Sequence, residues 1–339
     1  MPGWSASAPA KLVVAGEYAV VWGSPAISAA VDVRARATAV DGAPGWSLCV
    51  VNSGWRSEFT PTDAARLQWP ADPGADGALL QAAWRCLNPD GALTAVGPLA
   101  IELDSRAFYA ASGVKRGLGS SAAVAVALTA VLERALGRRP SAASCVAVHR
   151  EFQAQRGSGI DVVTSLRGGV VAKTGDTVTA LRWPESLAVT AVWTGVPAST
   201  PRLLQRLEVF AEAQPQVFAR ARDALGTAAG EVLDAWRDAS TQAIVESLYA
   251  FAEQLRHFDA RCGIGIWSAE HTALERLADD YGLVYKPSGA GGGDYGLAFG
   301  TQAARVEDFR LAVAERGFTA ADFDLCAPGL QVSDTDKFS

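Results

Sequence analysis

A glycine-rich turn that runs directly into an alanine-rich helical stretch, Lys115 to Ala122 and beyond, most constrains the fold of this chain. Glycines let a backbone approach an anion closely and adopt positive φ. A helix that starts there offers unpaired N–H groups and the positive end of its dipole. Ser120 and Ser121 add hydroxyls that can cap the helix, bind phosphate oxygen or coordinate Mg²⁺. A single G-x-G is also typical of an ordinary capped helix, so it predicts a phosphate site only together with other signals.

Two further glycine-rich turns supply those signals. Ser288 to Asp294 has glycine at four of the six positions from 289 to 294, and such freedom is costly to order. We therefore predict that this backbone passes close to a ligand or another loop, with Lys286 nearby as a cation. The turn from Arg156 to Asp161 ends in an acid, which is either a catalytic carboxylate or a helix N-cap. No P-loop sequence occurs, and the turns are not placed as in a dinucleotide-binding βαβ unit.

Composition limits the class of protein. The chain has 339 residues, enough for two hydrophobic cores, and is 49% apolar and 19% charged, as globular proteins are. Its net charge of −6 argues against a nucleic-acid partner. Five scattered cysteines without C-x-x-C spacing predict neither disulfides nor zinc and fit a reducing compartment. The longest apolar-rich stretch, 122–132, is shorter than the roughly 20 residues of a membrane span. We expect a cytoplasmic protein without a membrane partner.

Strands and helices alternate without a regular βαβ rhythm, which predicts an α+β fold. Pro184 interrupts the strand pattern, so we place a domain boundary there and expect domains at 1–185 and 186–339. We predict strands within 10–40, hairpins and loops over 41–78, and further strands at 98–104, 169–173, 177–182, 189–195 and 296–299. We predict helices at 77–87, from the first glycine turn to Arg138, at 141–155, 160–166, 268–281 and 302–316, and a helical region over 200–255.

Three segments together resemble the GHMP kinase superfamily, in the expected order. They are the opening APAKLVVAGEYAVVWGSPAISAAV, the GLGSSAAVAVA turn and the SGAGGGDYGLA turn. The segments GEYAVV, KRGLGSS, WTGVPAST and PSGAGGGD, with His149 and Gln153 before GSGIDV, resemble the branch that phosphorylates phosphomevalonate. Ala10 and Tyr295 depart from the glycine and cysteine that are usual there. The resemblance implies an N-terminal domain like domain 2 of ribosomal protein S5, a ferredoxin-like C-terminal domain, and a cleft for both substrates.

The same resemblance assigns roles to particular residues. It implies ATP and Mg²⁺ as cofactors, phosphomevalonate as the small-molecule acceptor, and a monomer or homodimer. Lys11 and Asp161 would be catalytic. The ATP phosphates would lie against Lys115, Gly117, Leu118, Gly119, Ser120, Ser121 and Ala122, with Ser121 also binding the metal. The acceptor would be bound by Glu17, Tyr18, Arg156, Ser158, Gly159, Ser288, Gly291, Gly292 and Asp294.

The acceptor changes what Asp161 must do. A phosphate monoester has its second pKa near 6, so its attacking oxygen is already largely anionic at pH 7. An additional carboxylate beside a dianion is unfavourable unless a cation offsets it. We therefore hypothesise that Asp161 orients Lys11 or helps to hold Mg²⁺. His149 is expected to be a structural histidine, and His257 and His271 to have no role. Two alternatives remain: a kinase acting on an alcohol such as mevalonate, and a catalytically silent binding protein of this fold.

Overall fold

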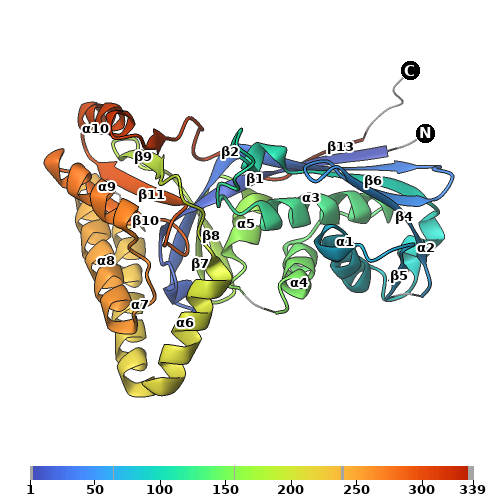
Figure 1. Ribbon diagram of the computed structural model, residues 1–339, viewed down its shortest axis with the longest axis horizontal. Helices are drawn as coiled ribbons and strands as arrows, with labels where there is room; N and C mark the ends of the chain where they lie inside the picture. Colours follow the sequence, from blue (N-terminus) through green and yellow to red (C-terminus); the bar gives the residue numbers. More distant parts are fainter. Residues whose placement is uncertain (1–2, 64, 156, 238–239, 335–339) are drawn as a thin grey trace.

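The computed structural model describes residues 3–63, 65–155, 157–237 and 240–334, arranged around two β-sheets (Figure 1). The elements up to residue 181 are β1 (Gly3–Ala15), η1 (Ala19–Trp22), β2 (Ala26–Asp41), β3 (Trp46–Val50), β4 (Trp55–Pro61), β5 (Leu67–Gln68), α1 (Gly74–Leu87), α2 (Ala92–Val96), β6 (Leu99–Asp104), η2 (Arg106–Phe108), α3 (Ser120–Ala135), α4 (Ala142–Phe152), α5 (Ile160–Arg167), β7 (Val170–Thr174) and β8 (Thr177–Leu181). The later elements are β9 (Ala188–Trp193), α6 (Thr200–Ala213), α7 (Pro215–Arg237), α8 (Thr241–Cys262), α9 (Ala269–Asp280), β10 (Val284–Pro287), β11 (Tyr295–Gly300), α10 (Ala303–Glu315), β12 (Thr319–Ala320) and β13 (Gln331–Asp334).

The first sheet has the strand order β13-β1-β2-β6-β3-β4-β5, with β7 and β8 joined to β2. Its pairs are antiparallel except β3 and β6, which run parallel. Helices α1, α3, α4 and α5 lie along one face of this sheet (Figure 1). The alanine-rich helix α3 is buried over most of its length, because small side chains allow close packing and a helix that is apolar all round belongs in a core. This packing fixes the N-terminus of α3 against β1.

The second sheet has the order β10-β11-β9-β12 and is entirely antiparallel. Helices α9 and α10 pack beside it, and α7 and α8 form a long antiparallel pair that extends away from it with α6 (Figure 1). The segment between β10 and β11 is the third glycine-rich turn. Because these two strands pair directly, the turn is held at one end of the second sheet, facing the first.

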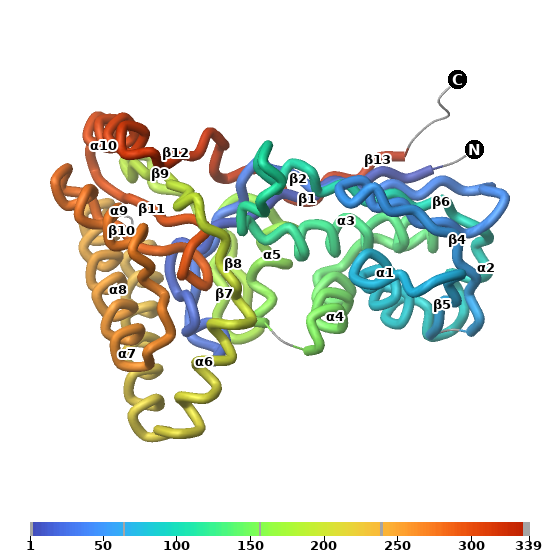
Figure 2. The backbone as a smooth tube through the Cα atoms, viewed as in Figure 1, coloured from blue at the N-terminus to red at the C-terminus, as the bar shows by residue number. Residues whose placement is uncertain are grey.

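The chain finally returns from the second sheet to the first. After β12, the backbone of 324–330 bonds to β2 and to the end of α5, and β13 pairs with β1. Figure 2 shows this segment running beside the N-terminal strand. Arg34 secures it by donating to the carbonyl oxygens of Pro328 and Gly329, both at 2.7 Å. The expected domain boundary at 185 falls between β8 of the first sheet and β9 of the second. The C-terminal strand β13, however, lies within the expected second domain but pairs with β1 of the first sheet.

Most predicted elements are confirmed in type, with three differences. Residues 16–21 were expected to continue a strand, but the chain turns inward there and forms η1 over 19–22, because Gly16 and Tyr18 have positive φ of 91° and 62°. The helical region expected over 200–255 is three helices that extend to Cys262. In the region 41–78, expected to hold hairpins and loops, β3, β4 and β5 pair antiparallel in sequence. The short elements α2, β10, β12 and β13 were not predicted individually, and β12 has only two residues.

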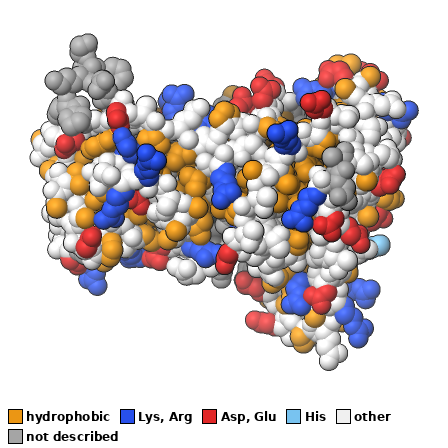
Figure 3. All heavy atoms as spheres, turned by 180° about the vertical axis from the view of Figure 1, so that it is seen from behind, with side chains coloured by type: hydrophobic (Ala, Val, Ile, Leu, Met, Phe, Trp, Pro, Cys, Tyr) orange, Lys and Arg blue, Asp and Glu red, His pale blue; other side chains and the backbone are white. Residues whose placement is uncertain are grey.

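On the face drawn in Figure 3, side chains of Lys and Arg are interspersed with those of Asp and Glu. Neither sign forms a continuous area among the described residues visible there. Within the described ranges, no helix combines the length and apolar character that crossing a membrane requires.

Candidate active site

A pocket of about 580 Å³ lies where the three glycine-rich turns meet. Gly119 from the first turn, Gly157 from the second and Gly289 from the third all line it. The predicted site residues that line the pocket are Lys11, Glu17, Tyr18, Lys115, Gly117, Gly119, Ser120, Ser121, Ser158, Asp161, Ser288 and Asp294. Segments up to 283 residues apart in the chain, from Lys11 to Asp294, therefore form one site between the two sheets.

Lys11 on β1 lies between the first and third turns. Its backbone N–H donates to the carbonyl of Leu118 at 3.1 Å, which joins the first turn to the strand. A methyl group added at Gly119 would lie 3.2 Å from Lys11 Cε, and one added at Gly289 would lie 3.8 Å from Lys11 Nζ. The side chain of Lys11 thus lies between two backbone turns, and a larger residue at Gly119 would require the Lys11 side chain to shift.

The first turn ends at Gly119, whose φ of 79° places it as the N-cap of α3. No described side chain caps this helix, so its first amides remain free to bind an anion beside Ser120 and Ser121. Lys115 lies at the entrance and is exposed. The combination of free amides, hydroxyls and an ammonium is suited to phosphate oxygens.

The third turn is fastened to the first sheet by side-chain bonds. Val13 N–H donates to Ser288 Oγ at 3.0 Å, and Ser288 Oγ is 2.9 Å from Val13 O. Tyr18 donates its hydroxyl proton to Ala290 O at 2.6 Å. The positions of Ser288 and Tyr18 are therefore explained by contacts within the protein, in addition to their place in the pocket wall.

Asp294 closes the third turn against the first. A methyl group at Gly117 would overlap the Asp294 carboxylate, so only glycine allows this contact. Asp294 Oδ1 accepts the Ala198 N–H at 3.1 Å. Burial raises the pKa of Asp294, while that hydrogen bond and the charges of Lys11 and Lys115 act in the opposite direction. Asp294 thus sets the spacing between the two turns and balances the cations of the pocket.

Glu17 and Lys286 form a buried ion pair at the inner edge of the pocket. Lys286 Nζ contacts Glu17 Oε1, and neither side chain is exposed. Burial raises the pKa of Glu17 and lowers the pKa of Lys286, and the contact between them opposes both shifts. Lys286 was expected as a cation for a ligand, but its ammonium is occupied by Glu17 and by Val13 O.

The second turn begins α5 at Gly159, and Asp161 lies in the first turn of that helix. Asp161 is therefore not the N-cap that the sequence left open. Its Oδ1 accepts the Val162 N–H at 2.9 Å, and its side chain is 24% exposed. No hydrogen bond or ion pair joins Asp161 to Lys11, both of which are described. The hypothesis that Asp161 orients Lys11 directly is therefore supported by no contact. The carboxylate instead remains available to the pocket.

The side chain of His149 on α4 lies beside the lining residues Ser121 and Asp161, although we expected it to be structural only. Its Nε2 lies 3.3 Å from Ser121 Oγ and 3.9 Å from Asp161 Oδ2, and its side chain is 4% exposed. Gln153, one helical turn later, places its amide nitrogen 3.5 Å from the same Ser121 oxygen. The i, i+4 spacing of His149 and Gln153 was the signal in the sequence that could have assigned both to one site.

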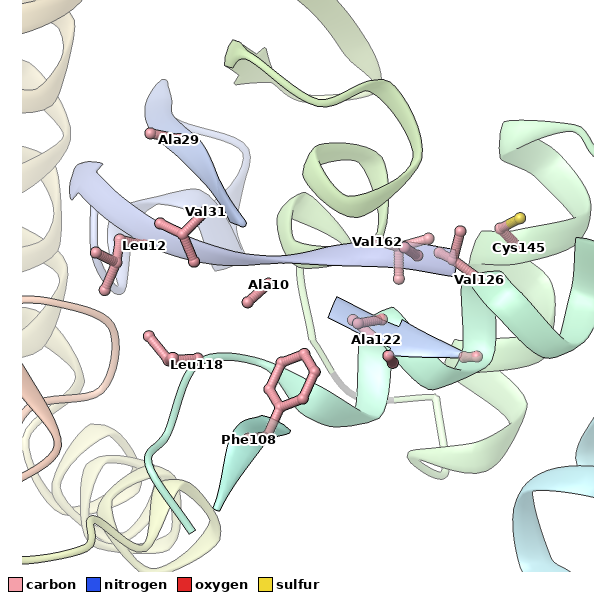
Figure 4. Packing of buried hydrophobic residues seen from close by; sticks show 14 of the residues in the cluster. Ala10, Leu12, Ala29, Val31, Phe108, Leu118, Ala122, Val126, Cys145 and Val162 are labelled. Carbon is pink, nitrogen blue, oxygen red and sulfur yellow. The ribbon is translucent and has the colours of Figure 1, made fainter. Parts of the chain in front are cut away.

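Several predicted residues do not line the pocket. Leu118 and Ala122 point into the core with Ala10, Leu12 and Phe108 (Figure 4). Gly159 is buried near Val146, and Gly291 and Gly292 pack against the 265–266 turn, where Gly292 N–H donates to Ile266 O at 2.7 Å. Arg156 lies outside the described residues. The other five residues support the turns, while residues next to them in the sequence line the pocket.

Sequence reasoning missed part of the wall and one supporting residue. Pro197 and Ala198, just before α6, and Thr200, Pro201 and Leu204, at its start, line the pocket; the first three belong to the WTGVPAST segment, to which the sequence assigned no site role. His271, expected to have no role, bonds to Gly293 O at 2.9 Å through Nε2 and to Tyr285 Oη at 2.8 Å through Nδ1. Because a carbonyl only accepts, Nε2 carries the proton, and burial lowers the pKa of His271 to about 4. The neutral ring therefore supports the third turn from below.

The described residues contain no cluster of three or more His, Cys, Asp or Glu side chains that could hold a metal ion. Mg²⁺ usually takes one or two protein oxygens and completes its shell with phosphates and water. Asp161 and Ser121, which both line the pocket, are the oxygens suited to such partial coordination.

Together these features form a pocket between the two sheets that is suited to phosphate groups, and comparison with known proteins gives the family of the chain. The model of the GHMP kinases N terminal domain matches residues 78–169. A phosphomevalonate kinase of Streptomyces sp. (strain CL190) is 31% identical over 335 residues, covering 84% of this chain and 87% of the relative. The chain therefore belongs to the GHMP kinase family and has its two-domain fold.

Solved structures agree with this fold. A Lin0012 protein from Listeria innocua superposes with a TM-score of 0.85 at 22% identity, covering 98% of this chain and 99% of the other. Phosphomevalonate kinase of Streptococcus pneumoniae, in complex with phosphomevalonate and AMPPNP, superposes with a TM-score of 0.77 at 17% identity, covering 95% and 99%.

Proposed function

We propose that this protein transfers the γ-phosphoryl group of ATP to the phosphate of (R)-5-phosphomevalonate and forms 5-diphosphomevalonate. The observation that carries the proposal is the position of Lys11, enclosed between the first and third glycine turns beside the open N-terminus of α3. The similarity to the Streptomyces phosphomevalonate kinase along most of both chains supports the acceptor. The bound phosphomevalonate and AMPPNP of the pneumococcal structure support both substrates for this fold.

In this proposal, the triphosphate lies against the first turn. The free amides at the start of α3 and the hydroxyls of Ser120 and Ser121 bind its oxygens, and Lys115 approaches from the entrance. Phosphoryl transfer depends mainly on positioning and on neutralising charge that develops on the transferred group. Lys11 is placed to neutralise that charge, because its ammonium faces the third turn across the same pocket.

The acceptor is a phosphate whose attacking oxygen is already largely anionic at pH 7, so no strong base is required. Asp161 has no contact with Lys11, which leaves a role at a metal ion or in orienting the acceptor. Mg²⁺ bound to the triphosphate would supply positive charge, and Asp161 offers it an anionic protein oxygen. The apolar side chains of Val20, Ile160, Pro201 and Leu204 on the pocket wall exclude water from the transferred group.

An assay with MgATP and two separate acceptors tests the proposal. Phosphomevalonate should be turned over and mevalonate should not, with diphosphomevalonate identified by mass spectrometry. Lys11→Ala serves as the matched inactive control. Turnover of mevalonate alone would instead establish an alcohol kinase, and ATP binding without turnover of either acceptor would indicate a binding protein.

A further inference from the structure

The third glycine-rich turn packs against another turn, residues 263–267, which lies between α8 and α9 and does not line the pocket. Gly292 N–H donates to the carbonyl oxygen of Ile266 at 2.7 Å. A methyl group added at Gly291 would lie 2.5 Å from Ile266 Cγ2 and 2.7 Å from the Ile266 carbonyl oxygen, which is closer than real contacts allow. The two turns therefore touch, and a shift of Ile266 would move the third turn with it.

Asp259, in the last turn of α8, holds this supporting turn with both oxygens of its carboxylate. Oδ1 accepts the Gly265 N–H at 2.7 Å, and Oδ2 accepts the Trp267 N–H at 2.8 Å. These two residues flank Ile266, whose carbonyl oxygen accepts the Gly292 N–H. Hydrogen bonds to an ionised acceptor are roughly twice as strong as neutral ones. One carboxylate thus fixes the backbone on both sides of the residue that contacts the third turn.

The end of α8 also supports the third turn by a second route. Tyr18 donates its hydroxyl proton to Ala290 O at 2.6 Å, and its ring packs against Phe258 with the ring centroids 5.8 Å apart. Burial raises the pKa of the Tyr18 phenol, and the charge of Asp259 raises it further, so the hydroxyl keeps the proton that it donates. The contacts at Ala290 and Gly292 therefore both lead back to Phe258 and Asp259, which are consecutive in α8.

Other contacts keep the 263–267 turn in place when the carboxylate is removed. Gly263 N–H donates to the backbone carbonyl of Asp259 at 2.8 Å and ends the helix. Arg206 on α6 donates to the carbonyl oxygen of Ile264 at 2.9 Å. Loss of the Asp259 side chain should therefore loosen the supporting turn without unfolding α8.

We propose that Asp259 is a positioning residue for phosphoryl transfer, which acts through Ile266 to hold the third glycine-rich turn in place against Lys11. The third turn supplies residues 288–290 to the pocket wall, and a methyl group added at Gly289 would lie 3.8 Å from Lys11 Nζ. This inference rests on the proposed function, because the turn belongs to the pocket in which the reaction is proposed to occur.

The proposal separates turnover from nucleotide binding. A misplacement of about 1 Å caused by a mutation far from the chemistry can reduce a rate about 100-fold. In the proposed function the triphosphate lies against the first turn, which has no printed contact with Asp259 among the described residues. Loss of Asp259 should therefore slow the transfer and leave the binding of the nucleotide almost unchanged.

Kinetics with MgATP and phosphomevalonate, together with calorimetric titration of AMPPNP and Mg²⁺, test this separation. Asp259→Ala should lower kcat/KM for phosphomevalonate about 10- to 100-fold, while its Kd for AMPPNP stays within about twofold of the wild type. Asp259→Asn keeps one acceptor oxygen for one of the two N–H groups and should recover part of the loss. Unchanged kcat/KM in Asp259→Ala would overturn the inference. A loss of AMPPNP affinity as large as the loss of kcat/KM would also overturn it, because a general disturbance of the pocket would explain both.

Asp72→Ala is the matched control. The Asp72 carboxylate also accepts a backbone N–H, that of Gly74 at 3.0 Å, but it does not line the pocket. This variant should have the kcat/KM of the wild type, and an equal loss in Asp72→Ala would contradict a specific role for Asp259. Urea unfolding of each variant checks that the protein measured is folded.

Hydrogen exchange followed by mass spectrometry tests the contact without any substrate. In Asp259→Ala, the amides of residues 286–294 should exchange faster than in the wild type, while those of the first turn, residues 115–122, should be unchanged. Unchanged exchange over 286–294 would overturn the inference whatever the kinetics show. If the wild type turns over neither acceptor, the proposed function fails, and the exchange data still decide whether Asp259 holds the third turn.

Discussion

Replacing Lys286 by methionine would remove one half of the buried ion pair and keep a side chain of similar length. Both Lys286 and Glu17 have 0% exposed side chains, so water does not screen the charge that remains. Removing one partner of a buried pair costs about 3–5 kcal/mol, because the other charge is left uncompensated. Total stability is typically about 5–15 kcal/mol. At pH 8 we therefore expect Lys286→Met to lose a large share of its free energy of unfolding.

The loss should shrink at lower pH. Burial raises the pKa of Glu17 above its ordinary 4.5, and Lys286 opposes this rise, so the folded-state pKa rises further when Lys286 is absent. A carboxyl with a raised folded-state pKa contributes stability that is fully present below its unfolded pKa and is lost as pH rises through the folded value. Above pH 4.5, each step toward acid therefore relieves part of the cost in Lys286→Met.

Urea unfolding followed by tryptophan fluorescence at pH 5 and pH 8 measures both effects, since the chain has 10 tryptophans. The control is Glu17→Gln/Lys286→Met, which has no buried charge at this position and should recover much of the lost stability at pH 8. The reasoning would be refuted by an equal loss at both pH values, or by a double variant no more stable than Lys286→Met.

Three other expectations concern the turns and their support. Gly117→Ala should reduce kcat/KM at least 100-fold, because its methyl group would displace Asp294. The control Gly113→Ala has a similar φ of 80° but no neighbour within 4 Å, so its activity should stay near that of the wild type. Similar losses in both variants would contradict a role for the contact between Gly117 and Asp294. Lys11→Ala should lower kcat/KM about 100- to 1,000-fold. Lys11→Arg should not restore full activity, because a planar guanidinium does not reproduce the compact charge of an ammonium; full activity of the arginine variant would exclude this reason. The folded-state pKa of His271 is lowered from 6.5 to about 4, so the free energy of unfolding of the wild type should fall by on the order of 3 kcal/mol as pH falls from 6.5 to 4. In urea unfolding, His271→Gln should lose less stability over this range. Parallel curves for the two proteins would exclude His271 as the titrating group.

Local signals in the sequence were sufficient for the elements whose causes are local. The alanine-rich run after Gly119 predicted α3, because glycine, serine and a continuous apolar stretch all agree there. The segment 19–21 was wrongly predicted as strand, since only the positive φ of Gly16 and Tyr18 turns it inward. The first residues of β1 pair with the end of β2 and with β13, which is more than 300 residues away, and no local pattern reports either pairing.

The same limit applies to the site. The sequence identified Lys11, Ser121 and Asp161 and the three turns, and the order of the turns suggested that they meet. It could not reveal that Lys286 is paired with Glu17, 269 residues away, because the two are adjacent only in the folded chain. The contact of His149 with Ser121 likewise depends on how α4 packs against α3. Contacts between distant segments, rather than the choice of residue types, decided which side chains are free to act.

The charges that line the pocket support the proposal that a metal ion takes part in the reaction. Among the described lining residues the cations are Lys11 and Lys115, while Asp161 and Asp294 are carboxylates and Glu17 is already paired. Two ammonium groups opposite two carboxylates leave little net positive charge for a triphosphate and a phosphorylated acid that bind together. The dipole of α3 adds about half a charge at its N-terminus. Since like charges held close in a protein repel strongly, the remaining neutralisation must arrive with the nucleotide, and a divalent cation bound to its phosphates provides it. On this reasoning Asp161 would favour the metal-bound nucleotide over the free one, because a carboxylate attracts the former and repels the latter.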